Sequence, residues 1–126
     1  MLFKAQNNPF EAIDRMVRKN ALVTAPPYAV EQALKRVGTY LKTARLRRNL
    51  SLQAAAAKIG TGVRAVRDAE AGRPGTSAAV YAALLWAYDL LSPFADLADP
   101  ARDETGLALA SQRKHAYPSK GLDNDF

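Results

Sequence analysis

Residues 45–72, RLRRNLSLQAAAAKIGTGVRAVRDAEAG, carry the pattern of two short helices separated by a turn that contains glycine. Ser51 is a favoured N-cap residue, and it precedes a first helix that we expect over residues 52–59. Gly60 ends that helix, and a second helix is predicted over residues 62–71. Two helices joined in this way cross steeply, which is the geometry of a helix-turn-helix whose second helix enters a DNA major groove.

The net charge of +6 is concentrated around this segment. Ten of the 18 Lys and Arg residues lie within residues 35–73, which hold only two acidic residues. Residues 74–126 hold seven acidic residues against four basic ones. A basic centre beside an acidic end indicates a polyanionic partner for one surface. The alternative is a solvated face that binds nothing.

Several other classes of protein are disfavoured by the composition. The chain has 126 residues, 48% of them hydrophobic, as expected for one domain with an arm. It has no Cys, no apolar run long enough to cross a membrane and no secretory leader, so we expect a cytoplasmic protein without disulfides. His115 is the only His, and no ligand cluster or catalytic constellation accompanies it, so we expect no metal, no cofactor and no enzyme.

The first half of the chain reads as helical. Asn8 and Pro9 are typical of a helix start, and a helix is predicted over residues 9–20. Residues 25–27, Ala-Pro-Pro, break the chain before a second helix, over residues 28–48. Its apolar stripe consists of Val30, Leu34, Val37, Leu41 and Ala44. Gly38 interrupts this stripe, and the sequence leaves open whether the helix continues or kinks there.

The second half also indicates an all-α fold. Ser77 caps a helix predicted to run to Leu91, and a short helix follows from Ser92 to Leu97. The inward positions of the longer helix are Val80, Leu84, Tyr88 and Leu91. Residues 107–110 could form a short strand or the last turn of a helix, and residues 117–126 an extended tail. We therefore expect an N-terminal helical arm (residues 1–34), a helix-turn-helix domain (35–98) and a C-terminal extension (99–126).

These elements resemble the Xre/Cro/phage-repressor family of five-helix DNA-binding domains over about residues 36–98. Within that family, two stretches are most similar to the HipB-like antitoxins that pair with HipA-type kinases. The first is residues 37–51, VGTYLKTARLRRNLS. The second is residues 90–103, LLSPFADLADPARD, followed by GLAL at residues 106–109.

The resemblance assigns structural roles and a DNA-reading face. It implies an ion pair between Arg45 of the first helix and Glu70 at the end of the recognition helix, with Gly60 in the turn. The implied core positions are Ile59, Val66 and Ala69. The face exposed to base edges would consist of Gly62, Val63, Arg64, Arg67 and Asp68.

The side chains on that face have readable chemistry. Arg64 can donate two hydrogen bonds to guanine O6 and N7. Asp68 lies four residues further on, so it could hold Arg64 in place or accept from cytosine N4. Arg67 could reach a base or a phosphate, and Val63 a thymine methyl group. The alternative is that both arginines touch only phosphates. Candidate phosphate contacts, or plain solvated groups, are Lys42, Arg47, Gln53, Lys58, Thr61 and Arg73.

Three positions depart from the family pattern. Leu52 stands where the family usually has a Gln that reaches the DNA backbone, and Gly62 weakens the first DNA contact. Ala55 stands where a Leu is usual, so the long first helix or the N-terminal arm should fill the core there. These three departures leave open a protein-binding module whose helix-turn-helix no longer reads DNA.

Trp86 is expected in the core or at a dimer interface.

The resemblance implies a repressor that binds a palindromic operator as a homodimer. More specifically, it implies an antitoxin that neutralises a HipA-type kinase toxin and represses their shared promoter. In the acidic tail, Leu122 and Phe126 are candidate anchors on that partner, the alternative being a disordered terminus. A stand-alone or phage-type repressor without a toxin remains the other interpretation. No membrane partner is expected.

Overall fold

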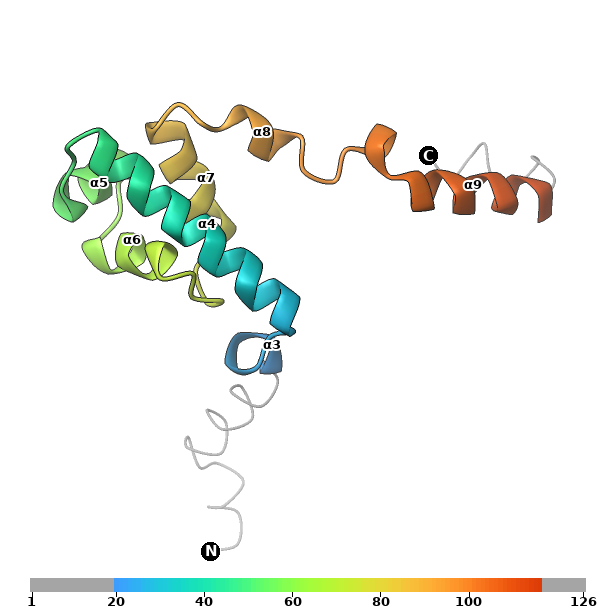
Figure 1. Cartoon of the computed structure of the whole chain (residues 1–126), viewed down its shortest axis with the longest axis horizontal. Coiled ribbons are helices and arrows are strands. Elements are labelled where there is room, and N and C mark those ends of the chain that lie inside the picture. Colours follow the sequence, from blue (N-terminus) through green and yellow to red (C-terminus); the bar gives the residue numbers. More distant parts are fainter. Residues whose placement is uncertain (1–19, 117–126) are drawn as a thin grey trace, which may run out of the picture. The chain divides into compact units, whose positions relative to one another are not determined.

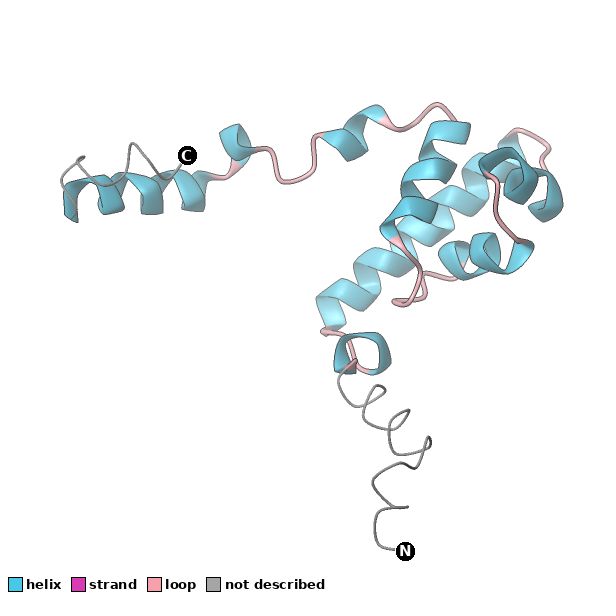
Figure 2. Ribbon diagram, turned by 180° about the vertical axis from the view of Figure 1, so that it is seen from behind, coloured by secondary structure: helices cyan, strands magenta, loops and turns pink. Residues whose placement is uncertain are grey.

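The computed structural model describes the backbone of residues 20–116 and the side chains of residues 20–113. This part of the chain contains seven α-helices and one 3-10 helix and no strand, so the all-α fold is confirmed (Figures 1 and 2). The chain divides into two units, residues 1–91 and residues 92–126, and each is described by itself. The helix predicted over residues 9–20 and the tail at residues 117–126 fall outside the described residues, except for Asn20.

The first unit is organised around one long helix. Helix α3 (Ala21–Thr24) is a single turn that precedes the predicted break at residues 25–27. Helix α4 (Tyr28–Arg47) then runs for 20 residues without interruption. The prediction of a helix over residues 28–48 is therefore confirmed to within one residue. The structure also settles the question left open at Gly38, because the helix continues straight through this residue.

The two short helices of the helix-turn-helix form as the sequence predicts. Helix α5 (Leu52–Ile59) is capped by Ser51, whose side chain accepts a hydrogen bond of 3.0 Å from the Ala54 N–H. Gly60 ends the helix in the left-handed region, with φ = 77°. This conformation carries little penalty for glycine alone, since other residues would place a Cβ against the backbone. Helix α6 (Val63–Glu70) begins three residues later.

Helix α7 (Ala78–Ala87) ends earlier than predicted. Ser77 caps it as expected, accepting a hydrogen bond of 3.3 Å from the Val80 N–H. The predicted end at Leu91 is wrong, because Asp89 adopts a left-handed conformation with φ = 61°. The Leu90 N–H then donates to the Leu85 carbonyl at 2.7 Å, which closes the helix.

The core of the first unit lies where α4, α5, α6 and α7 meet (Figure 2). Its buried apolar members are Leu41, Ala44, Ala55, Ala56, Val66, Ala69, Tyr81, Leu84 and Tyr88. Ala55 and Ala56 of α5 are buried and let this helix approach its neighbours closely, whereas Ala54 and Ala57 are exposed. Because Ala55 stands where a larger residue is usual, we expected α4 or the N-terminal arm to fill the space beside it. Leu41 of α4 belongs to the same core, whose largest side chains are Tyr81 of α7 and Tyr88 directly after that helix.

The structure divides the predicted apolar stripe of α4 and removes one of the two possibilities for Trp86. The stripe predicted on α4 is not one buried face, because Val30 and Val37 are 40% and 38% exposed whereas Leu41 is 2% exposed. The core reaches only the C-terminal part of α4, where α6 and α7 pack against it. Trp86 is 60% exposed and so does not belong to the core of the first unit.

Helices α4 and α6 approach so closely that Gly38 is required at their contact. A Cβ atom at position 38 would lie 2.5 Å from the Glu70 carbonyl oxygen and 2.6 Å from that of Ala69. Both are backbone atoms at the end of α6, so they cannot move away as a flexible side chain could. The approach explains why a residue of poor helix propensity stands in the middle of α4.

The second unit contains short helical segments. Helix α8 (Ser92–Ala95) is followed by the 3-10 helix η1 (Pro100–Arg102) and by helix α9 (Glu104–Ala116). The Asp103 carboxylate accepts a hydrogen bond of 2.9 Å from the Gly106 N–H, which caps the start of α9. Residues 107–110 are helical and not a strand, but they lie near the start of the longer helix α9 rather than in the last turn of a helix.

The tyrosine hydroxyls of the core lack partners. Neither the Tyr81 nor the Tyr88 hydroxyl has a hydrogen-bond partner among the described residues. Burial raises the pKa of both phenols above the ordinary value of 10.0. The nearby Glu70 carboxylate raises the pKa of Tyr88 further, while Arg45 and Arg48 lower it by less. Both rings are therefore held in their neutral form.

We expect Gly38→Ala to lower the free energy of unfolding by about 1–3 kcal/mol, because the added methyl group forces α4 and α6 apart. Urea unfolding followed by circular dichroism measures this change. Gly62→Ser is the control, since a Cβ at position 62 meets nothing within 4 Å. A Gly38→Ala variant as stable as the parent protein would contradict the close approach.

We expect the core tyrosines to make stability fall as the pH rises above about 10. The folded state holds their pKa above 10.0, the value in the unfolded chain, so the unfolded state loses its protons first and is favoured at higher pH. Urea unfolding between pH 8 and pH 11 measures the slope. Tyr88→Phe should reduce the slope while costing little stability at pH 7, because no partner of its hydroxyl is lost. An unchanged slope would contradict this assignment.

Candidate nucleic-acid interface

The end of helix α6 is fixed by a buried ion pair with α4. The Arg45 Nε donates to Glu70 Oε2 at 2.6 Å, and Arg45 Nη2 donates to Glu70 Oε1 at 3.1 Å. The two side chains are only 8% and 7% exposed. This bidentate pairing holds both carboxylate oxygens in one plane with the guanidinium group, so it fixes orientation as well as distance.

The same guanidinium group also holds the connection to α5. Arg45 Nη1 donates to the Leu50 carbonyl oxygen at 2.8 Å, directly before the Ser51 cap. The hydrogen bond with Glu70 raises the pKa of Arg45, which outweighs the opposing effect of burial. Arg45 therefore ties α4, the start of α5 and the end of α6 together. The position of α6 relative to the rest of the domain depends on it.

The predicted base-reading residues divide into two groups on α6. Arg64 and Arg67 are exposed, and so is Gly62, which is the N-cap of the helix but offers no side chain. Val63 and Asp68 are half-buried. The Val63 side chain packs against the core, so less of it is available to a thymine methyl group than the sequence suggested.

Asp68 is paired with Arg73 rather than with Arg64. The Arg73 Nε lies 3.3 Å from Asp68 Oδ1, and the Arg73 N–H donates to the Asp68 carbonyl oxygen at 3.0 Å. Of the two roles considered for Asp68, the structure therefore does not show the one that holds Arg64 in place. The Arg64 side chain is exposed. Arg73, a candidate phosphate contact, is partly occupied by its ion pair with Asp68.

The candidate phosphate contacts come from several elements. Gln53 and Lys58 are exposed on α5, and Thr61 is half-buried in the turn before α6. Lys42 and Arg47 are exposed on α4. Their exposed side chains leave room for a phosphate. Leu52 is half-buried and packs against the core, so it acts as an apolar anchor where the family pattern has a polar contact.

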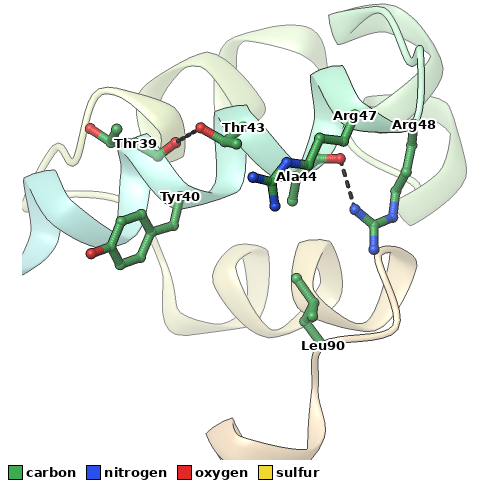
Figure 3. A pocket seen from close by; sticks show the side chains of 7 residues that line it. All are labelled: Thr39, Tyr40, Thr43, Ala44, Arg47, Arg48 and Leu90. Carbon is green, nitrogen blue, oxygen red and sulfur yellow. Dashed lines mark hydrogen bonds between the residues drawn. The ribbon is translucent and has the colours of Figure 1, made fainter.

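A pocket of about 470 Å³ lies on another face of α4. Its lining side chains come from α4 and from Arg48 directly after it, except for Leu90, which lies across from them (Figure 3). These residues are Thr39, Tyr40, Thr43, Ala44, Arg47, Arg48 and Leu90. Arg47, which the sequence made a candidate phosphate contact, therefore lines this pocket. The sequence did not indicate the pocket, because Leu90 is brought to α4 only by the fold.

Arg48 has a structural role that the sequence reasoning missed. Its guanidinium group donates to the Ala44 carbonyl oxygen at 2.9 Å and to the Tyr88 carbonyl oxygen at 2.8 Å. It also lies 5.6 Å from the centre of the Tyr88 ring. Arg48 thus joins the end of α4 to the end of α7. No local signal marks a contact between residues 40 positions apart.

The described residues 20–116 contain neither a metal-ion cluster nor a membrane-spanning helix. Within this range no group of three or more His, Asp or Glu side chains could hold a metal ion. None of the helices described there is long and apolar enough to cross a membrane. Leu122 and Phe126, the candidate partner anchors, lie beyond the described residues.

Comparison with known proteins supports the fold. A family model described as a helix-turn-helix domain matches residues 36–97, which begin within α4 and end just after α8. Comparison with curated proteins and with solved structures finds no match. Residues 36–97 therefore form a helix-turn-helix domain, in which α5 and α6 are the two helices of the motif.

We expect Glu70→Ala to lower the free energy of unfolding by about 3–5 kcal/mol, because it leaves the buried Arg45 charge unpaired. Asp68→Ala, which removes the exposed pairing with Arg73, should cost less than about 1 kcal/mol. Urea unfolding of both variants measures the difference. Equal losses for the two variants would mean that the buried pair does not anchor α6.

Proposed function

We propose that the protein is a sequence-specific DNA-binding repressor that reads base edges through helix α6. The observation that carries this proposal is the pair of exposed arginines, Arg64 and Arg67, on a helix whose end is locked by a buried ion pair. Reading a base requires a guanidinium group at a defined depth in the groove. The ion pair supplies a rigid helix, and the exposed arginines supply the donors.

Arg64 is the residue to which we assign the specific contact. It is exposed, it lies in the first turn of α6, and its nearest acidic candidate on that helix is engaged elsewhere. Its five N–H donors match the two acceptors that guanine presents in the major groove. Arg67, one turn later, would contact a second base or a phosphate. The positive charge of residues 35–73 would supply affinity that does not depend on sequence.

The operator would be palindromic and bound by a homodimer. A single α6 of eight residues reads only a few base pairs, which is too little for specific regulation. Two copies related by a two-fold axis would place their recognition helices about one helical turn apart, or roughly 34 Å. The exposed Trp86 side chain on α7 is one candidate for the surface that joins the copies.

A more specific role is that of the antitoxin in a type II toxin–antitoxin pair. It would bind and neutralise a HipA-type kinase and repress the operon that the two proteins share. This role is supported by the similarity of residues 37–51 and 90–109 to HipB-like antitoxins. Helix α9, with Leu107 and Leu109 each more than half exposed, offers apolar contacts to such a partner. A stand-alone repressor without a toxin is the alternative within the same fold.

A protein-interaction module is the second candidate function. It is favoured by Leu52, which packs against the core where a DNA-contacting Gln is usual, and by Gly62, which offers no side chain at the start of α6. Such a module would use the helix-turn-helix only as a scaffold. Its DNA affinity would be low and nearly independent of salt.

We expect the full chain to bind the promoter of its own operon more tightly than a scrambled duplex, with affinity falling steeply as salt rises. Arg64→Ala should cost about 1–3 kcal/mol on the specific duplex and relax the preference at one base pair. Fluorescence anisotropy over a salt series measures both effects. Arg102→Ala is the control, because this exposed arginine lies outside α5 and α6.

Two results would change the proposal in different ways. An even loss of affinity for both duplexes in Arg64→Ala would make Arg64 a phosphate contact. Weak binding of both duplexes by the parent protein, with a shallow salt slope, would favour the interaction module instead.

A further inference from the structure

The pocket beside helix α4 carries positive charge that the described part of the domain does not neutralise. Arg47 and Arg48 both line this pocket, and none of its lining residues is acidic. The Arg47 side chain is exposed and forms no ion pair with any carboxylate among residues 20–113. A guanidinium group presents paired N–H donors, which match the two oxygens of a carboxylate on another molecule.

The carboxylates of the first unit do not occupy this pocket. Within residues 20–91 they are those of Glu31, Asp68, Glu70 and Asp89. The first three already form ion pairs with other basic side chains, and Asp89 does not line the pocket. The positive charge at the pocket is therefore open to an anion that comes from outside the domain.

Arg48 covers groups that would repel such an anion. The last carbonyl groups of a helix are free acceptors that carry partial negative charge. Arg48 donates to the Ala44 carbonyl oxygen at 2.9 Å and to that of Tyr88 at 2.8 Å, so it binds one such group near the end of α4 and one directly after α7. Arg48 thus covers two acceptors beside the pocket and adds its own positive charge to that of Arg47.

The pocket also offers apolar surface to a ligand. Tyr40 and Leu90 are 65% and 43% exposed, and Leu90 lies across from α4 (Figure 3). Ala44 lines the pocket as well, although most of its surface is buried in the core. Covering exposed apolar surface is favourable, so these side chains suit a ligand with an apolar body.

The two threonines of the pocket fix which way such a ligand lies. Thr39 donates its hydroxyl hydrogen to the Lys35 carbonyl oxygen at 2.9 Å, and Thr43 donates to the Thr39 carbonyl oxygen at 3.1 Å. Only lone pairs remain on these hydroxyls, so they can accept a further hydrogen bond but not donate one. A carboxylate, which only accepts, gains nothing beside them. The anionic end of a ligand therefore belongs at the arginines.

We propose that this pocket binds a small molecule with one carboxylate group and an apolar body of one or two rings. The carboxylate accepts hydrogen bonds from Arg47, and the body lies over Tyr40 and Leu90. The volume of about 470 Å³ lies within the range of small-molecule pockets, roughly 300–1,000 Å³. Along α4 the pocket extends only from residue 39 to residue 48, a rise of roughly 14 Å, which suits a small molecule better than a protein segment.

Titration of the ¹⁵N-labelled full chain with 4-biphenylcarboxylate and with its neutral analogue 4-biphenylmethanol tests the proposal. Amide chemical shifts measure both the affinity and the place of binding. We expect the largest changes at residues 39–48 and at Leu90, and roughly tenfold tighter binding of the carboxylate, because a hydrogen bond between charged groups is stronger than one to a neutral hydroxyl. Equal affinities, the absence of binding or changes centred on other residues would each overturn the proposal.

Three variants separate the charge from the apolar contact. Arg47→Gln should abolish the preference for the carboxylate, whereas Arg36→Gln should keep it, since Arg36 is an exposed arginine of the same helix that does not line the pocket. Leu90→Ala should weaken both ligands by a similar factor, because it removes apolar surface and leaves the charge. Equal loss of preference in the two glutamine variants would indicate a general effect of net charge and would overturn the proposal. No DNA enters these titrations, so their outcome is independent of the proposed repressor function.

Discussion

The position of the recognition helix depends on one buried ion pair. Arg45 binds both carboxylate oxygens of Glu70 and also the carbonyl oxygen of Leu50, so a single guanidinium group joins α4, α5 and α6. Burying two charges is costly unless each is fully paired, and here the pairing is bidentate. The ion pair therefore contributes less to the free energy of unfolding than to selecting a single arrangement of α4, α5 and α6. For a helix that must present arginines at a fixed depth, that uniqueness is the property that matters.

Small residues allow the elements around this ion pair to pack closely. Gly38 lets α4 touch the backbone at the end of α6, and the fully buried Ala55 and Ala56 let α5 approach the core. Tyr81 of α7 and Tyr88 directly after it bring large rings into the same core. Arg48 then bonds to the backbone of Tyr88 and lies over its ring, which links the end of α7 to α4. The domain is held by close backbone contacts on one side and by large rings on the other.

The exposed surfaces of the first unit differ in chemistry, and each suits a different partner. The face of α6 presents Arg64 and Arg67, which suits a nucleic acid. On α4, the side chains of Val30, Val37 and Tyr40 are exposed, and they offer apolar contacts instead. Because these surfaces belong to different helices, each can be changed separately by substitution.

The sequence by itself determined most helix starts and the helix-turn-helix motif, but not the end of α7 or the extent of α9. Ser51 and Ser77 cap their helices through hydrogen bonds to backbone groups three residues away, and Gly60 ends α5 through its own backbone conformation. Such signals are local, so they can be read from the chain. The contact between Arg45 and Glu70 was inferred only through a family resemblance. Tertiary structure alone decided that Asp68 pairs with Arg73, that Arg48 binds Tyr88 and that Val30 and Val37 stay exposed. Each of these depends on which helix packs against which face, and the spacing of residues along one helix does not contain that information.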